Sequence, residues 1–335
     1  MIGYNDVSFE WLIEQLYNGS IHTNLSDYQR KSWVKYCYHF SNVQNIASIL
    51  NRGIIYSRNK SNQLAVMGND NASSEVIGQT DSRVKDYVRF YFRPKTPTQF
   101  NNEGFRSSYT MSSYCAHCPV PIFLLFDLNG VLNLKNSSFT NSSLANNIEH
   151  YLMNTPQEFQ ELPFSKIYHS SPLTPDIRDE IVACRHAEIV VPHELEIDGL
   201  LQKILVRSMA EKRTLLSLLS DEARYKYSHL IQIDSKKTVF FARWDYFENV
   251  TLTENRIRII DNNTGLNSQY NLYVVLNDKQ NRIEQTYNNK SWSASGDFIL
   301  DIGTPTNNYD IEIYLDGNLA YKDKFEAMRE FNQPF

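Results

Sequence analysis

The sequence predicts an α+β fold for residues 1–235 and a small all-β, sandwich-like domain for residues 236–335. Helical and strand patterns alternate in the first part, whereas the second part contains strand-like runs with no helical pattern between them. The chain has 335 residues, of which 41% are hydrophobic. This length is sufficient for a large and a small domain, each with its own core.

A helix is predicted at residues 40–53, FSNVQNIASILNRG, because its apolar residues recur at helical spacing and Gly53 is a typical helix end. The apolar residues that share one face are Val43, Ile46, Ile49 and Leu50. Residues 54–57 follow as a short strand. The polar segment from Arg58 to Arg83 is too long for a structureless connection in a compact domain, and we interpret it as a loop that covers a ligand.

Buried strands are predicted at residues 86–94, 121–129 and 187–192, since each run is rich in aliphatic and aromatic residues and is bounded by polar residues or proline. Residues 141–153, between the last two strands, predict a helix with a Ser/Asn start. Residues 200–230 predict a helical tail to this part of the chain.

The C-terminal part is predicted to be a small antiparallel β-sandwich, because strand-like runs follow one another at short intervals. These runs are TVFFARWDYF (238–247), VTLTENRIRIID (250–261), YNLYVVLND (270–278), DFILDIG (297–303) and YDIEIYLDGNLAYKDKF (309–325). Asp316 and Gly317 stand between two alternating stretches of the last run, which predicts a two-residue hairpin turn there.

Charge and hydropathy exclude several classes of protein. The net charge is −5, with 33 basic and 38 acidic residues, which argues against a protein that coats nucleic acid by bulk electrostatics. The sequence shows neither a secretory signal pattern nor an apolar run of membrane-spanning length. We therefore expect a cytoplasmic protein without a membrane partner.

The cysteines predict reduced thiols, because Cys37, Cys115, Cys118 and Cys184 are few and scattered. The CAHC motif at residues 115–118 has the spacing of half a zinc site, but its second half would lie far along the chain without its own CxxC. A Cys184–His186 nucleophile is disfavoured, because a base two residues along a strand seldom reaches the thiol proton while both groups address a substrate. No metal is predicted.

Glu188 is an unusual residue for its position, because it directly precedes the apolar residues of a predicted buried strand. An ionised carboxylate is rarely buried without a partner. If Glu188 and Val190 share one face of the strand, that face is a solvated edge or a cleft. From the residues alone, a solvent-facing or salt-bridged structural glutamate and a catalytic glutamate both remain open.

Four segments, in this order, resemble the DarT family of ADP-ribosyltransferases, which use NAD to modify nucleobases. The segments are HFSNVQNIASILNRGI (39–54), VKDYVRFYFRPKTP (84–97), PIFLLFDL (121–128) and RHAEIVV (185–191). The resemblance covers about residues 36–209 and implies an ADP-ribosyltransferase-like split β-core, NAD as the donor and Glu188 as the catalytic residue. A carboxylate suits this chemistry, because it can stabilise the positive charge that develops on the ribose when nicotinamide leaves.

The resemblance also implies positions for the other site residues. It places His39, Asn42, Gly53 and Tyr87 at the NAD, and it makes Arg83 the candidate for the loop arginine that helps to deprotonate the target base. Without the resemblance, His39 would be read as a satisfied core histidine. Two further aromatic residues of the same strand, Phe90 and Phe92, are expected to pack in the core.

The resemblance implies a nucleobase acceptor, and we expect a base of single-stranded DNA. An unstacked base is needed, which favours single strands and stacking aromatic residues. The predicted nucleic-acid contacts are Lys85, Arg89, Arg93 and Lys95, although such charges are also typical of a solvated face. The same chemistry on RNA is the alternative acceptor. The resemblance further implies a toxin with a macrodomain antitoxin as partner.

An alternative function of a different class is that the C-terminal β-sandwich is a binding or sensor module, fused to an inactive transferase. Intact Glu188 and His39 speak against an inactive transferase. The sequence contains neither the GxGxxG nor the GxxxxGK[ST] phosphate-binding motif, so NAD is not expected to bind as it does in a Rossmann domain.

Overall fold

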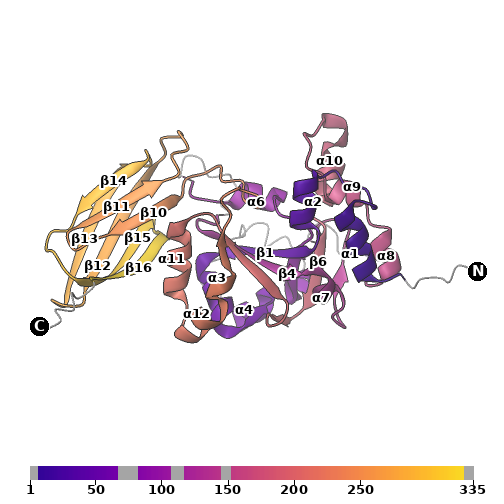
Figure 1. Cartoon of the computed structure of the whole chain (residues 1–335), viewed down its shortest axis with the longest axis horizontal. Coiled ribbons are helices and arrows are strands. Elements are labelled where there is room, and N and C mark those ends of the chain that lie inside the picture. Colours follow the sequence, from indigo (N-terminus) through magenta and orange to yellow (C-terminus); the bar gives the residue numbers. More distant parts are fainter. Residues whose placement is uncertain (1–6, 67–81, 107–116, 145–151, 328–335) are drawn as a thin grey trace, which may run out of the picture.

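The computed structural model describes residues 7–66, 82–106, 117–144 and 152–327. A mixed sheet with surrounding helices occupies the N-terminal part, and further all-β sheets occupy the C-terminal part, at the opposite end of the molecule from the N-terminus (Figure 1). The predicted α+β fold class with an all-β C-terminal region is therefore confirmed.

The central sheet of the described chain has seven strands in the order β5-β6-β3-β1-β4-β8-β9. The strands are β1 (Tyr36–Asn42), β3 (Tyr87–Tyr91), β4 (Pro121–Asp127), β5 (Ser138–Phe139), β6 (Glu188–Pro192), β8 (Leu201–Val206) and β9 (Ile231–Ile233). Neighbours are antiparallel except β8 and β9. A separate pair joins β2 (Ile54–Tyr56) to β7 (Glu194–Glu196).

The sheet opens between β1 and β3, and this split positions the site. Strand β1 pairs with β4 along its whole length. With β3 it shares a single paired position, Tyr38 opposite Tyr91. Beyond that position the two strands diverge, so the side chains at their edges can face a hollow instead of a neighbouring strand. The expected split β-core is present.

Helices surround this sheet. They are α1 (Phe9–Asn18), α2 (Asp27–Trp33), α3 (Val43–Arg52), α4 (Arg58–Gln63), α6 (Pro97–Asn102), α7 (Leu128–Leu132), α8 (Pro156–Gln160), α9 (Phe164–Ile167), α10 (Pro175–Cys184), α11 (Met209–Leu218) and α12 (Asp221–Tyr227), with 3₁₀ turns η1 (Ser82–Asp86) and η3 (Ser228–Leu230). The predicted helix at residues 40–53 corresponds to α3, which buries its apolar face. It ends at Gly53, whose φ of 70° lies in the left-handed region that favours glycine.

Two sequence predictions in this part are wrong. Residues 201–206, predicted as helix, form the strand β8, because they pair with β4 on one side and β9 on the other. Residues 58–63, predicted as part of a loop, form α4, which Ser57 caps by accepting a hydrogen bond from Lys60 N. Most of the helix predicted at residues 141–153 lies outside the described residues.

The C-terminal part contains two antiparallel sheets. One is formed by β10 (Phe247–Leu252), β11 (Arg256–Asp261) and β14 (Asp297–Asp301), and the other by β12 (Gln269–Asp278), β13 (Ile283–Ser293), β15 (Asn308–Leu315) and β16 (Asn318–Glu326). The hairpin at Asp316 and Gly317 is confirmed, and both residues have the positive φ that a type I′ turn requires. The division of the chain at residue 235 stays a prediction.

The predicted strand at residues 238–247 is wrong except for its last residue. Strand β10 begins only at Phe247, and the preceding residues form an irregular connection. The backbone N–H groups of Phe241 and Ala242 donate to the carboxylate of Glu103, at 3.0 and 2.6 Å. A side chain therefore satisfies the donors that a neighbouring strand would satisfy in a sheet.

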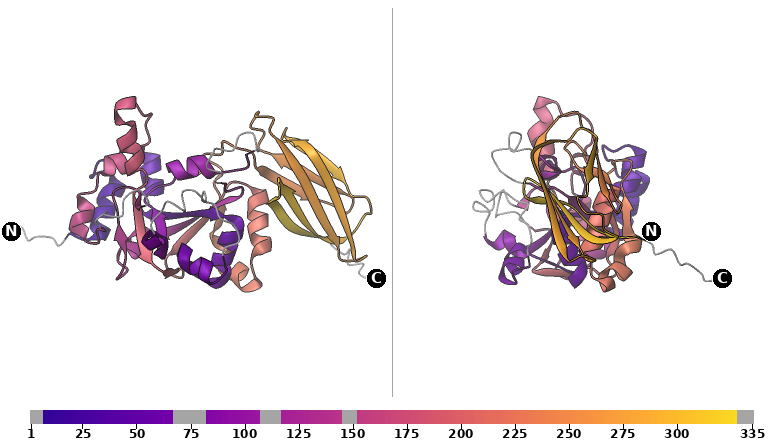
Figure 2. Two further views of the ribbon diagram at one scale, coloured as in Figure 1. Left: turned by 180° about the vertical axis from the view of Figure 1, so that it is seen from behind. Right: turned by 90° about the vertical axis from the view of Figure 1, so that its left-hand side faces the viewer.

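Helix α11 attaches the C-terminal sheets to the rest of the protein (Figure 2). It contacts α3 on one side and β10 and β16 on the other. Lys322 N donates to Thr214 Oγ1 at 3.2 Å, and Ser217 Oγ donates to Lys322 O at 2.8 Å. One continuous hydrophobic cluster includes Leu50 of α3 and Leu272 of β12, so the core runs through both parts.

Within the described residues, no helix is both long and apolar enough to cross a membrane.

Candidate active site

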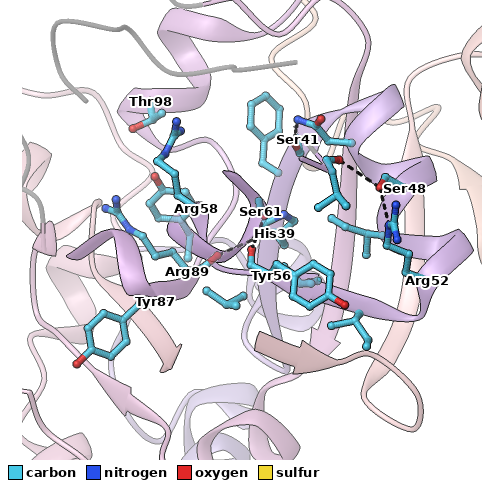
Figure 3. Close-up of a pocket in the computed structure, with 18 of the residues that line it drawn as sticks. His39, Ser41, Ser48, Arg52, Tyr56, Arg58, Ser61, Tyr87, Arg89 and Thr98 are labelled. Carbon is cyan, nitrogen blue, oxygen red and sulfur yellow. Dashed lines mark hydrogen bonds between the residues drawn. The ribbon is translucent and has the colours of Figure 1, made fainter. Parts of the chain in front are cut away.

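A pocket of about 280 Å³ opens where β1 and β3 diverge, close to the lower end of the range of ligand sites (Figure 3). Strands β1, β2 and β3 and helices α3, α4 and α6 contribute its walls. Its polar and charged lining in the described chain consists of His39, Ser41, Asn45, Ser48, Arg52, Tyr56, Arg58, Ser61, Tyr87, Arg89, Tyr91, Thr98 and Asn102. The site is thus polar on several sides and basic.

His39 faces this pocket from β1, and its role as an NAD-binding residue stays a prediction. Its Nδ1 lies 3.3 Å from the carbonyl oxygen of Arg89. A carbonyl only accepts, so Nδ1 carries the proton and Nε2 is left as an acceptor. Burial lowers the pKa of His39, which keeps the ring neutral at physiological pH. A neutral ring with a free Nε2 can accept a hydrogen bond from a sugar hydroxyl.

Three arginines give the pocket its positive charge. Arg52 comes from the last turn of α3, Arg58 from the first residue of α4, and Arg89 from β3. Sequence reasoning missed Arg52 and Arg58 as site residues. The sequence offered one indication, since Arg52 and Arg58 flank the short segment that links α3 to α4. A dinucleotide carries two phosphates, and arginine pairs with phosphate through a bidentate fork.

Glu188 is buried and tightly held. Only 1% of its side chain is exposed, and Arg89 grips it through Nε to Oε1 at 3.1 Å and Nη2 to Oε1 and Oε2 at 2.6 and 2.8 Å. Leu144 N donates to Oε2 at 3.1 Å. The expectation that the face of Glu188 and Val190 is a solvated edge or a cleft is wrong, because both residues are fully buried. Glu188 is salt-bridged instead, and its partner Arg89 lines the pocket.

The protonation states of the groups next to Glu188 follow from its negative charge. Burial by itself lowers the pKa of Arg89, but the Glu188 carboxylate outweighs this effect and raises the pKa above its ordinary value. Tyr91 lies opposite Glu188 on the paired strand, and burial together with the Glu188 charge raises the pKa of its hydroxyl. Arg89 is therefore a permanent cation and Tyr91 a neutral hydroxyl beside the carboxylate.

His186, two residues before Glu188, predicts a pH dependence of stability. Burial, and secondarily the Arg89 charge, lower its pKa to about 4. An unfolded chain has a histidine pKa of about 6.5, so between about pH 6.5 and pH 4 the unfolded state binds more protons and the free energy of unfolding falls as the pH falls. Substituting His186→Gln is expected to reduce this loss by roughly 2–3 kcal/mol at pH 4.

Urea unfolding of both proteins between neutral pH and the pKa of His186 measures this difference. The matched control is His22→Gln, because His22 is exposed. If the His186→Gln curve runs parallel to that of the parent protein over the whole pH range, His186 is not a buried neutral ring.

Arg93 corrects one prediction. Its side chain is almost fully buried, with the guanidinium donating to the carbonyl oxygens of Ile167 (3.1 Å), His169 and Pro94 (3.0 Å). It also lies over the Trp33 ring. Burial keeps the guanidinium away from solvent and from a phosphate, so Arg93 is removed from the predicted nucleic-acid contacts.

The other predicted contacts are more accessible. Lys85 lies in η1 and Lys95 follows β3, and both are partly exposed. Lys95 Nζ donates to Lys237 O at 2.9 Å, which fixes this lysine beside the connection to the C-terminal sheets. Arg89 is 32% exposed but is engaged by Glu188. Contacts of these three side chains with nucleic acid stay predictions.

The remaining predicted site residues are partly brought together. Tyr87 lines the pocket beside Arg89, and Arg83 is exposed in η1 just before β3. Asn42 is buried at the start of α3, where its Oδ1 accepts from Val120 N at 3.2 Å, and it is outside the described lining of the pocket. Gly53 lies at the opposite end of α3, beside Tyr227. Asn42 and Gly53 therefore frame the helix that forms a pocket wall.

Phe90 and Phe92 are confirmed as core residues, because both are fully buried. The cysteines Cys37, Cys118 and Cys184 are buried free thiols, and Cys115 of the CAHC motif lies outside the described residues. In residues 7–66, 82–106, 117–144 and 152–327, no group of three or more His, Cys, Asp and Glu side chains is placed to hold a metal ion.

Comparisons with known proteins identify a family for the chain and two solved structures to which it is similar. The family model described as "ssDNA thymidine ADP-ribosyltransferase, DarT" matches residues 38–241, more than half of the chain. The structure of Thermus sp. 2.9 DarT in complex with ADP-ribosylated ssDNA is 18% identical, with a TM-score of 0.46, and covers 60% of this chain and 95% of its own. The structure of the same protein in complex with NAD+ is 17% identical, with a TM-score of 0.44, and covers 60% of this chain and 96% of its own. A comparison with curated proteins finds no match.

The class of protein is thereby defined as an ADP-ribosyltransferase. The chain belongs to the DarT family. The family match ends near the connection at residues 238–247, so the C-terminal sheets lie outside it.

Proposed function

We propose that the protein transfers ADP-ribose from NAD to a base of single-stranded DNA, with Glu188 as the catalytic carboxylate. The observation that carries this proposal is the buried Glu188–Arg89 pair at the wall of a basic pocket that also contains the His39 ring. The family description names thymidine in single-stranded DNA as the acceptor, which supports DNA over RNA.

In this proposal different lining residues bind different parts of the NAD molecule. His39 Nε2 accepts a hydrogen bond from a ribose hydroxyl, and Arg52 and Arg58 pair with the diphosphate. Tyr87 stacks on a ring of the dinucleotide. Asn42 and Gly53 act indirectly, because they fix the two ends of α3, which carries Asn45, Ser48 and Arg52 into the pocket.

The transfer breaks the glycosidic bond between nicotinamide and its ribose, and the bonding electron pair leaves with nicotinamide. Positive charge develops on the ribose carbon, where a nearby carboxylate stabilises it. A ring nitrogen of the base then attacks this carbon and loses its proton to Glu188 or to a group close to it. Arg89 must turn from Glu188 toward the pocket for this to happen, and its partial exposure permits that movement.

Arg83 and Lys85 are proposed to act on the acceptor. Both lie in η1, immediately before the strand that carries Tyr87 and Arg89. A cation at this position can bind a phosphate of the acceptor strand or lower the pKa of the target base.

Labelled NAD tests the acceptor. With single-stranded DNA, duplex DNA and RNA of the same sequence offered in parallel, the label is expected on single-stranded DNA, because a paired base is not accessible to the pocket. Label on RNA alone would refute the choice of DNA while leaving the chemistry intact. Label on none of the three would refute transfer to a nucleobase.

We also propose that the modification makes the protein a cytoplasmic toxin, whose partner is a macrodomain antitoxin that removes the mark. The support is the family to which the chain belongs. Growth arrest on induced expression, relieved by Glu188→Gln and by co-expression of a macrodomain hydrolase, tests this role. Arrest that persists in Glu188→Gln would contradict it.

A further inference from the structure

A row of cations and aromatic rings lies on α6, on the residues that flank it and on the connection to the C-terminal sheets. We call the six residues Lys95, Phe241, Phe100, Arg243, Trp244 and Arg106 the α6 row. Helix α6 lies between α2 and the C-terminal sheets in Figure 1. Three of these residues come from the connection, at or beyond the end of the family match.

The contacts along the α6 row are continuous. Lys95 Nζ is 5.9 Å from the Phe241 ring centre, and the Phe241 and Phe100 rings meet edge to face at 5.2 Å. Arg243 Cζ lies 3.9 Å from the Phe100 ring centre and 5.5 Å from that of Trp244. Arg106 Cζ lies 5.7 Å from the same Trp244 ring. Each ring therefore has a cation within contact distance.

Two buried side chains next to the α6 row fix the backbone of the connection. Glu103 accepts from the backbone of Phe241 and Ala242, and Gln99 Nε2 donates to Glu103 Oε2 and Val239 O at 2.6 and 2.8 Å. Both Gln99 and Glu103 are buried, so the carboxylate faces inward. The positive charge of Arg243 and Lys95 stays accessible at the surface, while these bonds fix the backbone that carries Phe241.

Packing alone does not explain the outer surface. Phe100 remains 44% exposed, and Arg243 is exposed and forms no ion pair with a carboxylate in the described part of the chain. Burial of Arg106 lowers its pKa, and the charge of Arg243, which lies against the same Trp244 ring, lowers it further. A phosphate beside them would offset this repulsion.

The α6 row also lies on the way to the pocket. Thr98 and Asn102 of α6 line the pocket, whereas Phe100 points to solvent from the same helix. A helix with its side chains is about 10 Å across, which a single strand spans in about three nucleotides at the spacing of B-DNA. A strand whose target base enters the pocket can therefore cross α6 within a few nucleotides.

We propose that the α6 row is a stacking platform for the acceptor strand, which holds unpaired bases a few nucleotides away from the modified one. Bases stack on Phe100 and on the guanidinium of Arg243, while Arg243 and Lys95 neutralise phosphates. This inference rests on the proposed function for the identity of the strand as single-stranded DNA. It assigns to the connection a role in substrate binding.

Binding measured without chemistry tests the platform. Full-length Glu188→Gln protein is titrated into fluorescent single-stranded DNA of about 4 and about 16 nucleotides, and the anisotropy gives Kd at several salt concentrations. Adding Phe100→Ala is expected to weaken binding of the long strand about tenfold and that of the short strand much less. Tyr225→Ala removes an exposed ring elsewhere, on α12, and is the matched control.

The salt dependence separates a strand contact from a structural clasp. Arg243→Gln is expected to reduce the slope of log Kd against log salt by about 0.7, whereas Arg243→Lys keeps the charge and the slope. Arg256→Gln, an exposed arginine of β11, should leave it unchanged. Equal loss for both strand lengths, or an unchanged slope in Arg243→Gln, would show that the row only joins the connection to α6.

Failure of the platform and failure of the proposed function give different results. Labelled DNA with an unchanged slope in Arg243→Gln overturns the platform alone. A slope that changes on RNA as it does on DNA, together with label on RNA, supports the platform and overturns the choice of acceptor. A rise of the melting temperature with NAD confirms in each variant that the catalytic part is folded.

Discussion

Replacing Glu188 by Gln is expected to lower the rate of ADP-ribosyl transfer by about 10²–10³-fold, the cost of removing one group that stabilises transition-state charge. Glutamine has nearly the same shape but lacks the negative charge that opposes the developing positive charge on the ribose. The rate is measured as labelled oligonucleotide formed from labelled NAD. The variant should still bind NAD, because other residues contact the dinucleotide.

The control for this substitution must account for the buried pair. The partly exposed Arg89 loses its counter-charge in Glu188→Gln, and a charge that is partly shielded from water destabilises a protein when its partner is removed. The melting temperature is therefore measured with and without NAD for both proteins. Glu194→Gln is the matched variant, since Glu194 is also ion-paired, with Lys60, but is exposed. A stable, NAD-binding Glu188→Gln protein with full activity would make Glu188 a structural residue.

Arg207→Met is expected to reduce the free energy of unfolding by about 3–5 kcal/mol, the typical cost of leaving a buried charge without its partner. Only 1% of the Arg207 side chain is exposed, and its Nε donates to Glu211 Oε1 at 2.8 Å. It also donates to Pro119 O at 3.0 Å and lies 4.3 Å from the Tyr246 ring centre. Its loss leaves Glu211 and the nearby Glu103 without a cation.

Urea unfolding at neutral pH measures this effect. Arg258→Met is the control, because the Arg258–Asp297 pair on the C-terminal sheet is half exposed and is expected to contribute at most about 1 kcal/mol. The double variant Arg207→Met/Glu211→Leu should recover part of the stability, since it removes both charges. Equal losses for Arg207→Met and Arg258→Met would contradict the importance of burial.

The fold could be predicted where local pattern and tertiary structure agree. Helix α3 combines an apolar stripe with Gly53 at its end, and the Asp316-Gly317 turn joins two alternating strands. The pattern predicts helix where β8 forms, because this short apolar run directly precedes α11. Periodicity alone does not distinguish a short buried strand from a helical segment. Its pairing with β4 and β9 decides the outcome.

The candidate site shows the same limit. Glu188 could be singled out because a carboxylate before a buried strand needs a partner, yet its partner Arg89 was assigned to nucleic acid. Arg93 looked like a surface charge, but backbone carbonyls distant in sequence surround it. The apolar run at residues 238–247 predicts a strand, but in the structure the Glu103 carboxylate accepts from its backbone N–H groups in place of a neighbouring strand. Such long-range contacts leave no local signal in the sequence.

The most direct test of the account is the mass of the product. One oligonucleotide with a single thymidine is incubated with unlabelled NAD, and oligonucleotide and released nicotinamide are quantified together by mass spectrometry. The oligonucleotide is expected to gain one ADP-ribosyl group for each nicotinamide released, and Glu188→Gln is expected to slow both by about 10²–10³-fold. Release of nicotinamide without a modified oligonucleotide would contradict transfer to DNA and leave only cleavage of NAD.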